Sequence, residues 1–309
     1  MKLRSVTKTA ALAAGVLTLL VGSGCSRDHI NAINLANRGD KSVKVNVENA
    51  ISLYQQALQL DPTNHRILWK LSKAYEEKKD WDKMASTLSR AVQVAPGFAN
   101  YWANRGYALI REAEAGNADA YAEAKQPLQK CIEKDPNYAE CYHFLGEAAL
   151  WTDDTQGALS NYTKAIEHNA HTAYFYPPLA ETYISLKFYK EAGQVLKEGT
   201  SLIQPSKANN NNLYGMYVLR FQVAQANDDK PEMVASMEQA QKVAGNTHPE
   251  ISFNLGSTYA VMDPPQKEKA VRLLSSFSKR ACRSAKAKKY KEQCETSSAL
   301  IQKLGGKVN

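Results

Sequence analysis

The sequence of 309 residues lacks the short motifs that usually mark an active site. It contains no phosphate-binding P-loop, no glycine-rich dinucleotide turn and no G-x-S-x-G nucleophile motif. Its carboxylates are scattered at the spacing of a solvated surface, so no acid–base pair stands out. These absences argue against an enzyme, and we expect no cofactor.

Potential metal ligands are also sparse, since the chain holds only six histidines and five cysteines. His168 and His171 come closest to a metal-binding pair, but no third ligand lies near them in the sequence. We interpret this pair as part of a polar turn between two structural units. The sequence therefore predicts no bound metal.

Long hydrophobic runs are absent apart from one, which lies near the N-terminus. Lys2, Arg4 and Lys8 precede an uncharged stretch over residues 9–24 that is rich in Ala, Leu, Val and Gly. This order is typical of a secretory signal peptide, and the 16 residues of the stretch are few for a membrane-spanning helix. We expect residues 1–24 to be a signal peptide that does not belong to the fold.

The run ends in Val21-Gly22-Ser23-Gly24-Cys25, which resembles the lipobox of bacterial lipoproteins, although Gly22 stands where those proteins most often have Leu. The resemblance implies that Cys25 is lipidated, and each buried CH₂ of an acyl chain contributes about 0.8 kcal/mol to membrane binding. Ser26 is similar to the residue at this position in lipoproteins sent to the outer membrane. An outer-membrane anchor facing the periplasm is thus implied; the alternative is a soluble periplasmic protein.

The charge of the chain is unevenly distributed. The net charge of +8 becomes +5 without the three signal-peptide cations, and residues 266–309 alone hold 12 Lys or Arg against 3 Glu. A basic end on a mildly acidic chain is usually a solvated surface, but it also suits anionic lipid, cell-wall polymer or an acidic partner. Nucleic acid is not an expected partner in the bacterial envelope.

The four cysteines after Cys25 form two local pairs. Cys131 and Cys141 lie symmetrically about Pro136-Asn137, where two antiparallel helices would bring them within bridging distance. Cys282 and Cys294 would be about 18 Å apart on one straight helix, so a bridge between them requires a hairpin. An oxidising compartment favours both disulfides, and four buried thiols are the alternative.

The most informative pattern that is present recurs at intervals of 34 residues or somewhat more. A small residue or Met is followed four residues later by an aromatic residue, Leu or Met, and three after that usually by a second small residue. The copies begin at Ala50, Met84, Ala124, Ala158, Ala192, Met233 and Ala270. Seven copies of one helical pattern indicate a repeat architecture, in which function lies on a repeated surface.

A second helical pattern lies between these copies, with apolar residues three and four apart and a recurrent Gly, Ser or Ala. Each unit is therefore expected to be a pair of antiparallel helices. Pro62, Pro96 and Pro136 follow the unit ends, where a helix cannot continue.

These patterns together resemble the tetratricopeptide repeat family over about residues 28–283. Residues 142–170 meet the W-x2-L-G-x2-Y, A-x3-F-x2-A and P pattern nearly whole, and residues 68–96 and 176–199 meet it well. In the sixth repeat, Arg220 and Phe221 stand where the family has Leu and a small residue. The resemblance implies an all-α fold, a right-handed superhelical solenoid of about seven helix pairs with a C-terminal capping helix.

On this basis we divide the mature chain into four parts. Repeats 1–5 occupy residues 25–205, an Asn-rich linker residues 206–212, and repeats 6–7 residues 213–283. The remaining residues, 284–309, form a basic capping helix and tail.

The resemblance also implies a concave groove lined by the first helix of each pair. Aromatic side chains among cations, amides and carboxylates suit an extended peptide or a partner helix. The alternative is that these side chains only cover their neighbours. The predicted groove residues are Arg66, Trp69, Lys73, Asn104, Tyr107, Arg111, His143, Glu147, Trp151 and Tyr174.

The sequence therefore predicts a non-enzymatic, lipid-anchored scaffold for protein–protein interaction in the bacterial envelope. Among tetratricopeptide lipoproteins it looks most like the pilotin type, which assists assembly of an outer-membrane complex. The alternative is an accessory module that regulates peptidoglycan enzymes, or that docks on an anionic cell-wall polymer through its basic C-terminus.

Overall fold

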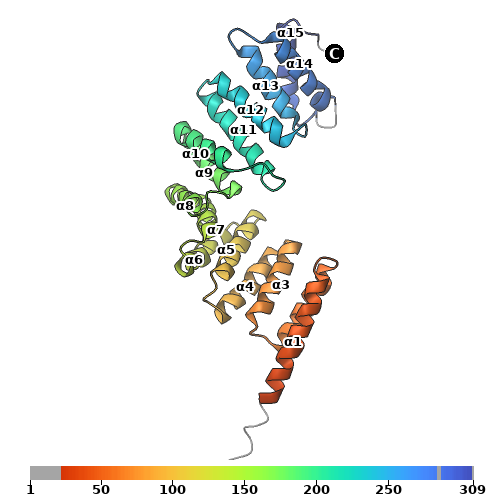
Figure 1. Cartoon of the computed structure of the whole chain (residues 1–309), viewed down its shortest axis with the longest axis vertical. Helices are drawn as coiled ribbons and strands as arrows, with labels where there is room; N and C mark the ends of the chain where they lie inside the picture. Colours follow the sequence, from red (N-terminus) through yellow and green to blue (C-terminus); the bar gives the residue numbers. More distant parts are fainter. Residues whose placement is uncertain (1–21, 284–286, 308–309) are drawn as a thin grey trace, which may run out of the picture. The chain divides into compact units, whose positions relative to one another are not determined.

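The computed structural model describes residues 22–283 and 287–307, and all regular elements in these ranges are helical. The chain divides into two compact units, residues 1–136 and 137–309 (Figure 1). Each unit consists of helix pairs stacked in sequence order, which confirms the all-α repeat fold.

Unit 1 contains three helix pairs. In each pair the two helices make extensive contact with one another, and within the unit the second helices of the first two pairs also pack on the first helix of the pair that follows. The pairs are α1 (Gly22–Ser42) with α2 (Val47–Leu60), α3 (His65–Lys78) with α4 (Trp81–Val94), and α5 (Ala99–Glu114) with α6 (Ala120–Lys134).

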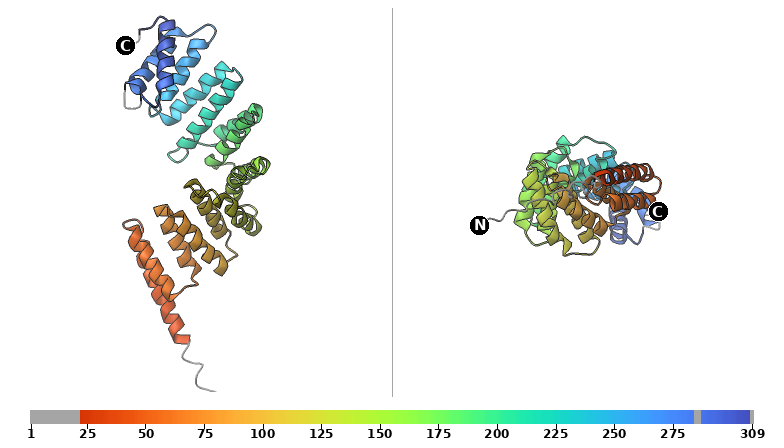
Figure 2. Two further views of the ribbon diagram at one scale, coloured as in Figure 1. Left: turned by 180° about the vertical axis from the view of Figure 1, so that it is seen from behind. Right: turned by 90° about the horizontal axis from the view of Figure 1, so that it is seen from below.

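Unit 2 contains four further pairs and a final helix (Figure 2). The pairs are α7 (Ala139–Leu150) with α8 (Thr155–His168), α9 (Tyr176–Ser185) with α10 (Tyr189–Leu202), α11 (Asn210–Ala226) with α12 (Lys230–Ala244), and α13 (Pro249–Val261) with α14 (Lys267–Phe277). A short 3-10 helix, η1 (Ala173–Phe175), precedes α9, and a π-helical turn, η2 (Ser278–Cys282), leads toward α15 (Lys291–Lys303).

The turn inside a helix pair has a recurring construction. Lys79, Asp153, Lys187 and Asp228 adopt left-handed backbone angles, with φ between 53° and 62°. Three of these turns are followed by an Asp whose side chain accepts the amide of the third residue beyond it: Asp80 before α4, Asp154 before α8 and Asp229 before α12. Such side-chain caps satisfy amides that the helix itself leaves unpaired.

The recurring small residues lie where neighbouring helices meet. A Cβ added at Gly106 would lie 2.4 Å from a carbon of Leu128, and one at Gly146 would lie 2.7 Å from the ring of Tyr162. Side chains at the repeated positions are almost all fully buried, among them Ala50, Ala57, Ala91, Ala124, Ala158, Ala165, Ala192 and Ala270. The 34-residue pattern is therefore the packing signature of the helix pairs.

The N-terminal prediction falls largely outside the described residues, which begin at Gly22. Cys25 lies in the first turn of α1, and its lipidation stays a prediction. Among the residues that the structure places, no helix combines the length and apolarity needed to cross a bilayer.

The Asn-rich stretch differs from the linker expected over residues 206–212. Helix α11 begins at Asn210, so Asn210, Asn211 and Asn212 form its first turn. The Asn210 side chain accepts the amide of Ser206 at 3.0 Å, and the Asn209 side chain donates to the carbonyl of Gln204 at 3.0 Å. Asparagine favours such local contacts, so these residues build a turn and a helix start.

The C-terminal helix α15 covers the last helix pair, as expected of a cap. Ser297 is fully buried and donates to the Leu274 carbonyl at 3.2 Å, while Ile301 is 1% exposed. A disulfide joins Cys282 to Cys294, whose Cα atoms lie 5.7 Å apart. Cys131 and Cys141 are buried and are not free thiols, and their mutual bridge stays a prediction.

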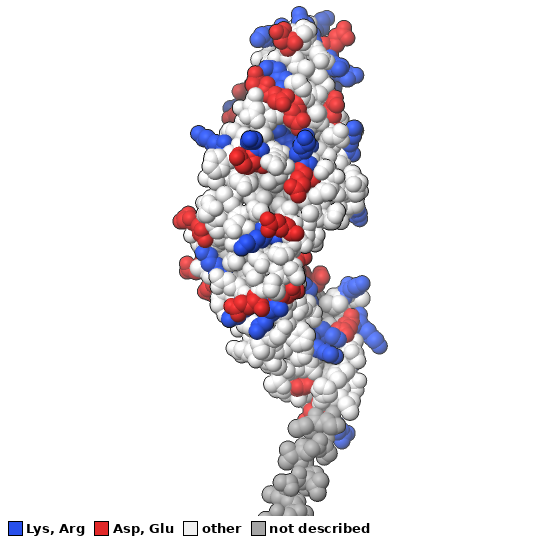
Figure 3. All heavy atoms as spheres, turned by 60° about the vertical axis from the view of Figure 1, so that its left-hand side comes forward, with Lys and Arg blue, Asp and Glu red and all other residues white. Residues whose placement is uncertain are grey.

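The charged side chains of both signs are interspersed on the face drawn in Figure 3. This face therefore has no single sign of electrostatic potential, and a charged partner would be recognised by local groups of charges.

Candidate functional site

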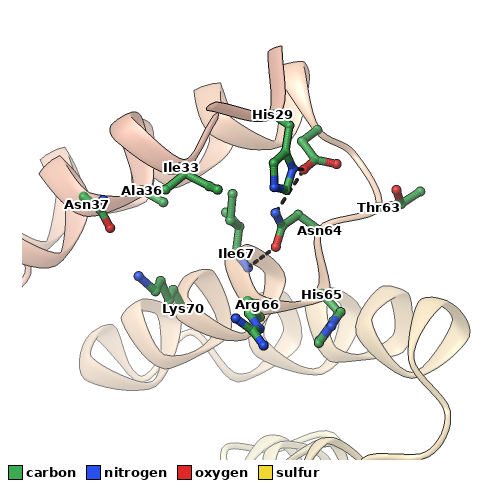
Figure 4. A pocket seen from close by; sticks show the side chains of 11 residues that line it. His29, Ile33, Ala36, Asn37, Thr63, Asn64, His65, Arg66, Ile67 and Lys70 are labelled. Carbon is green, nitrogen blue, oxygen red and sulfur yellow. Dashed lines mark hydrogen bonds and ion pairs between the residues drawn. The ribbon is translucent and has the colours of Figure 1, made fainter. Parts of the chain in front are cut away.

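A pocket of about 610 Å³ opens between α1 and α3 in unit 1 (Figure 4). Its apolar part consists of Ile33 and Ala36 from α1 and Ile67 from α3. Ala36 and Ile67 are buried, whereas Ile33 is 39% exposed. A hollow of this size with an exposed aliphatic side chain beside it can accommodate an apolar side chain of a partner.

One end of the pocket is fixed by hydrogen bonds around Asp61. His29 Nδ1 lies 2.6 Å from Asp61 Oδ2, and the Asn64 amide donates to the same oxygen at 3.0 Å. Asn64 also caps α3, because its Oδ1 accepts the amide of Ile67 at 3.2 Å. The α2–α3 turn is thereby tied to α1, and Figure 4 shows His29 and Asn64 meeting at that end.

The rim of the pocket is cationic and amide-rich. Arg66 and Asn37 are exposed, and Lys70 forms an ion pair with Asp40. Guanidinium and amide groups are the donors that carbonyl oxygens and carboxylates need. The pocket therefore suits an apolar side chain flanked by main-chain carbonyls or acidic groups.

An aromatic cluster, His65, Trp69, Phe98 and Tyr101, continues from the pocket toward α5. The rings of Trp69 and Tyr101 stack at 5.3 Å and those of Phe98 and Tyr101 at 5.1 Å, while His65 Nδ1 lies 2.9 Å from the Tyr101 hydroxyl oxygen. Burial raises the pKa of Tyr101, against the opposing effect of the Arg66 charge. Phe98 remains 48% exposed, so the aromatic cluster has one solvent-exposed ring, that of Phe98, beside the pocket.

The other predicted groove residues of unit 1 also make contacts within the unit. Lys73 lies 5.4 Å from the Trp69 ring centroid and pairs with Glu76. Asn104 donates to the Asn100 carbonyl at 2.8 Å. Arg111 lies 5.3 Å from the Tyr107 ring centroid and 2.7 Å from Glu114. These side chains belong to α3 and α5, the first helices of their pairs, and each already contacts a neighbour within the unit.

The predicted groove residues of unit 2 are less uniform. Trp151 is 65% exposed and Tyr174 37% exposed, the latter within η1. His143 is only 5% exposed, with its ring 5.0 Å from that of Tyr174 and 5.2 Å from that of Phe175. His143 therefore belongs to the packing of unit 2 and is not an accessible groove residue, while Glu147 is half-buried. Contact between these residues and a partner stays a prediction.

Sequence reasoning missed the part of the pocket that α1 supplies. His29, Ile33 and Asn37 lie in a helix whose sequence departs from the repeat consensus, so no motif pointed to them. The signal that could have found them is a helical spacing of four residues across His29, Ile33 and Asn37, which places them on one helix face.

Neither the pocket nor the rest of the described chain brings together three or more His, Cys, Asp or Glu side chains that could hold a metal ion. His168 stacks on the ring of Tyr142 at 4.9 Å at the end of α8.

Comparison with known proteins identifies the repeats. Residues 46–105, which span α2 to α5, match the tetratricopeptide repeat family. These residues therefore contain tetratricopeptide repeats. Repeats of this kind are interaction scaffolds that present extended binding surfaces to other proteins.

A curated human relative, Superkiller complex protein 3, is 29% identical over 141 residues, which is 45% of this chain. The match spans only 9% of the length of that protein. The likeness therefore concerns a set of repeats and not the whole relative.

Solved structures share the fold at low sequence identity. The Pseudomonas aeruginosa pilF structure has a TM-score of 0.54 at 16% identity, covering 77% of this chain and 100% of that one. A tetratricopeptide repeat protein from Parabacteroides merdae has a TM-score of 0.50 at 17% identity, covering 74% and 84%. A MamA structure has a TM-score of 0.50 at 23% identity, covering 55% and 91%.

Proposed function

We propose that this protein is a non-enzymatic scaffold that binds an extended peptide or a helix of a partner protein along the first helices of its repeats. The observation that carries the proposal is the pocket between α1 and α3, which continues into the aromatic cluster. It combines a hollow, an exposed aliphatic residue and cationic donors on two first helices of one unit. In a protein interface, a few large side chains buried in such hollows supply most of the binding energy.

The composition of the pocket defines the partner segment. An aliphatic or aromatic side chain would lie over Ile33 and Ala36, and an acidic side chain or main-chain carbonyl would meet Arg66. A ring or proline next to it would pack on the exposed face of Phe98. A short apolar segment with one flanking acidic residue is the expected ligand.

The place of action in this proposal is the bacterial envelope. The N-terminal sequence supports a lipid anchor on Cys25 and an outer-membrane position facing the periplasm. There the scaffold would assist assembly of an outer-membrane complex, in the manner of a pilotin. A Cys25→Ser variant tests the anchor: it should move from the membrane to the soluble fraction, and unchanged membrane association would contradict it.

The pocket itself is tested with an Ile33→Asp/Arg66→Glu variant of the full chain. Partners are crosslinked in the envelope and compared with those of the wild type. A Lys44→Glu/Val45→Asp variant is the matched control, because it makes the same changes of charge and polarity in the exposed turn between α1 and α2. We expect the pocket variant to lose at least one partner that the control keeps. Identical partner sets for all three proteins, with equal thermal unfolding, would overturn the proposal.

A second candidate function rests on the basic segment near the C-terminus. Arg283, Lys288, Lys289 and Lys291 are mostly exposed, and none forms an ion pair with any residue that the structure describes. The disulfide between Cys282 and Cys294 brings the two ends of this cationic segment together. Concentrated, unneutralised cations suit an anionic cell-wall polymer, which is the contact expected of an accessory to peptidoglycan enzymes.

This second candidate is tested with isolated cell wall. Binding should fall as salt rises, and a Lys288→Gln/Lys289→Gln/Lys291→Gln variant should bind more weakly than the wild type. The control Lys190→Gln/Lys207→Gln/Lys242→Gln removes the same charge from exposed sites elsewhere in unit 2. Equal loss in both variants would show a general charge effect and would exclude a dedicated surface.

A further inference from the structure

Two outer pockets lie between the second helices of successive pairs in unit 2. The first has a volume of about 420 Å³ and lies among α8, α9 and α10. The second has a volume of about 400 Å³ and lies among α10, α11 and α12. Each therefore has a first helix, α9 or α11, as its third side, and α10 is shared by both. Figure 1 shows α8, α10 and α12 following one another along unit 2.

The first of these, the acidic pocket, has an apolar interior and carboxylates around it. Ile166, Leu179 and Val195 are the aliphatic lining residues, and Glu167, Glu191 and Glu198 are the carboxylates, with no Lys or Arg in the lining. All three glutamates are exposed. A long basic side chain fits such a hollow, because its aliphatic stem packs on apolar surface while its charged end meets the carboxylates.

The second, the basic pocket, has the opposite charge. Lys197 and Arg220 line it together with the hydroxyl groups of Thr200 and Ser201, and no carboxylate is in the lining. Lys197 is exposed and forms no ion pair with the described residues. Arg220 is held by Glu232, so Lys197 supplies the uncompensated charge.

The two pockets are the same site in successive repeats. Thr163, Ile166 and Glu167 of the acidic pocket correspond to Lys197, Thr200 and Ser201 of the basic pocket, each 34 residues further along. Leu179, Val195 and Glu198 likewise correspond to Arg220, Ser236 and Gln239, each 41 residues further along.

The charge inversion arises from four of these changes. Two carboxylates are replaced by neutral polar groups, Glu167 by Ser201 and Glu198 by Gln239. Thr163 is replaced by a lysine and Leu179 by an arginine at the matching positions. The departure of the sixth repeat from its family pattern at Arg220 is therefore part of a coherent change in one site.

The spacing of the pockets follows from the shared helix. Glu198 and Lys197 are consecutive residues of α10 and line different pockets. A helix with its side chains is about 10 Å across, so this is the approximate separation of the two sites. Seven residues of a partner helix span about the same distance, at 1.5 Å per residue.

We propose that the two outer pockets form one docking surface for a helix of a protein partner that carries a basic and an acidic side chain about seven residues apart. The basic side chain enters the acidic pocket and the acidic side chain enters the basic pocket. Charge complementarity of this kind selects a partner and fixes its register. This surface is formed by helices α8 to α12 of unit 2 and does not depend on the pocket between α1 and α3.

The test uses the full-length protein and three synthetic helical peptides of about 20 residues, long enough to form helix in an Ala-rich sequence. One carries Lys and Glu about seven residues apart, and the others carry Lys and Lys or Glu and Glu at the same positions. At low salt, the mixed peptide should bind about tenfold more tightly than either control, measured by fluorescence anisotropy. Added salt should remove the difference. Equal affinities for the three peptides would overturn the proposal.

A protein variant makes the test specific to these pockets. Glu167→Lys/Glu198→Lys turns the acidic pocket basic at two exposed positions, so the variant should prefer the Glu and Glu peptide. The control Glu268→Lys/Glu295→Lys makes the same change at exposed sites outside both pockets and should keep the wild-type preference. An unchanged preference in the pocket variant would contradict the proposal. Self-association of the wild type in sedimentation, lost in the pocket variant alone, would instead identify a second copy as the occupant.

Discussion

Arg220 donates two hydrogen bonds to one oxygen of Glu232, from Nε at 2.9 Å and from Nη2 at 2.6 Å. Its Nη1 donates to the Thr200 hydroxyl oxygen at 2.9 Å, and Ser236 donates to the same Glu232 oxygen, also at 2.9 Å. These contacts join α10, α11 and α12 through polar groups. In the preceding repeat the position of Arg220 is occupied by Leu179, which is buried by apolar packing.

The arginine contact should stabilise unit 2 measurably. Arg220→Leu removes three donors and leaves the Glu232 carboxylate without its cation, so the free energy of unfolding should fall by about 1–3 kcal/mol. Urea unfolding measures the change. The double variant Arg220→Leu/Glu232→Leu removes the stranded charge as well and should be more stable than the single variant. A double variant that is as unstable as the single one would show that the carboxylate was not the cause.

Two helical glycines of unit 2 should respond oppositely to alanine. At Gly256 in α13 a new Cβ would lie 2.8 Å from Leu274 Cγ and 3.1 Å from its backbone nitrogen, and backbone cannot move aside. Gly256→Ala should therefore destabilise the protein by about 1–3 kcal/mol. At Gly215 in α11 no atom lies within 4 Å, so Gly215→Ala should stabilise it by about 0.5–1 kcal/mol. Chemical unfolding of both variants decides; effects of the same sign would contradict the packing argument.

Glu250 should make unit 2 sensitive to acid. It accepts hydrogen bonds from Tyr214 at 3.1 Å and Tyr290 at 3.0 Å, and His248 Nδ1 lies 2.9 Å from it. Burial acts to raise the pKa of Glu250, but hydrogen bonds from backbone and these side chains outweigh it, so the pKa lies below the usual 4.5. The resulting stability is present above pH 4.5 and is lost as pH falls through the lowered pKa of the folded state.

The measurement for this prediction is the thermal midpoint between pH 7 and about pH 3. Glu250→Gln should be less stable than the wild type at pH 7 and should lose less of its remaining stability on acidification. Glu295→Gln, at an exposed position of α15, is the control and should follow the wild type. Parallel pH profiles for the wild type and Glu250→Gln would contradict the assignment.

The disulfide between Cys282 and Cys294 should stabilise the C-terminal cap. It closes a loop with a sequence separation of 12 residues, and loops of this length correspond to about 2–3 kcal/mol in the chain-entropy description. Cys282→Ser/Cys294→Ser should lower the free energy of unfolding by that amount, measured by chemical denaturation under oxidising conditions. An unchanged free energy would mean that packing of Tyr290 and Phe277 alone holds the segment.

Most of the fold was predictable because its determinants are local and repeated. The small residues at positions such as Ala158 and Ala192 gave the register, and both are fully buried. Pro62, Pro96 and Pro136 marked the ends of repeats, whereas the capping of second helices by Asp80, Asp154 and Asp229 became visible only in the structure. Seven pairs and a final helix follow from counting these signals.

The candidate site was less predictable, because exposure depends on neighbours from other repeats. Trp69 was expected on the groove and lies on the first helix α3, but its ring stacks on Tyr101 of the next first helix. His143 occupies a position on a first helix that looked accessible, but aromatic rings from η1 and α8 enclose it. A periodic pattern gives the face of a helix and not the size of the side chains packed beside it.

The composition of the outer pockets was also not predictable from the sequence. The substitution of Arg220 for the usual Leu was visible in the sequence, but its partners Glu232 and Thr200 lie 12 and 20 residues away on different helices. Only the folded chain shows that the change coincides with changes at Lys197 and Gln239 in one hollow.

Each outer pocket takes its lining from two adjacent helix hairpins, that is, from two successive helix pairs. No single hairpin therefore forms a complete pocket. If the fifth hairpin were grafted into another repeat protein, it would bring part of the lining of both outer pockets but neither pocket complete. Any evolutionary or engineered exchange that preserves this surface must therefore move hairpins in neighbouring sets, and a single duplication would create a hybrid hollow with a charge that neither parent site has.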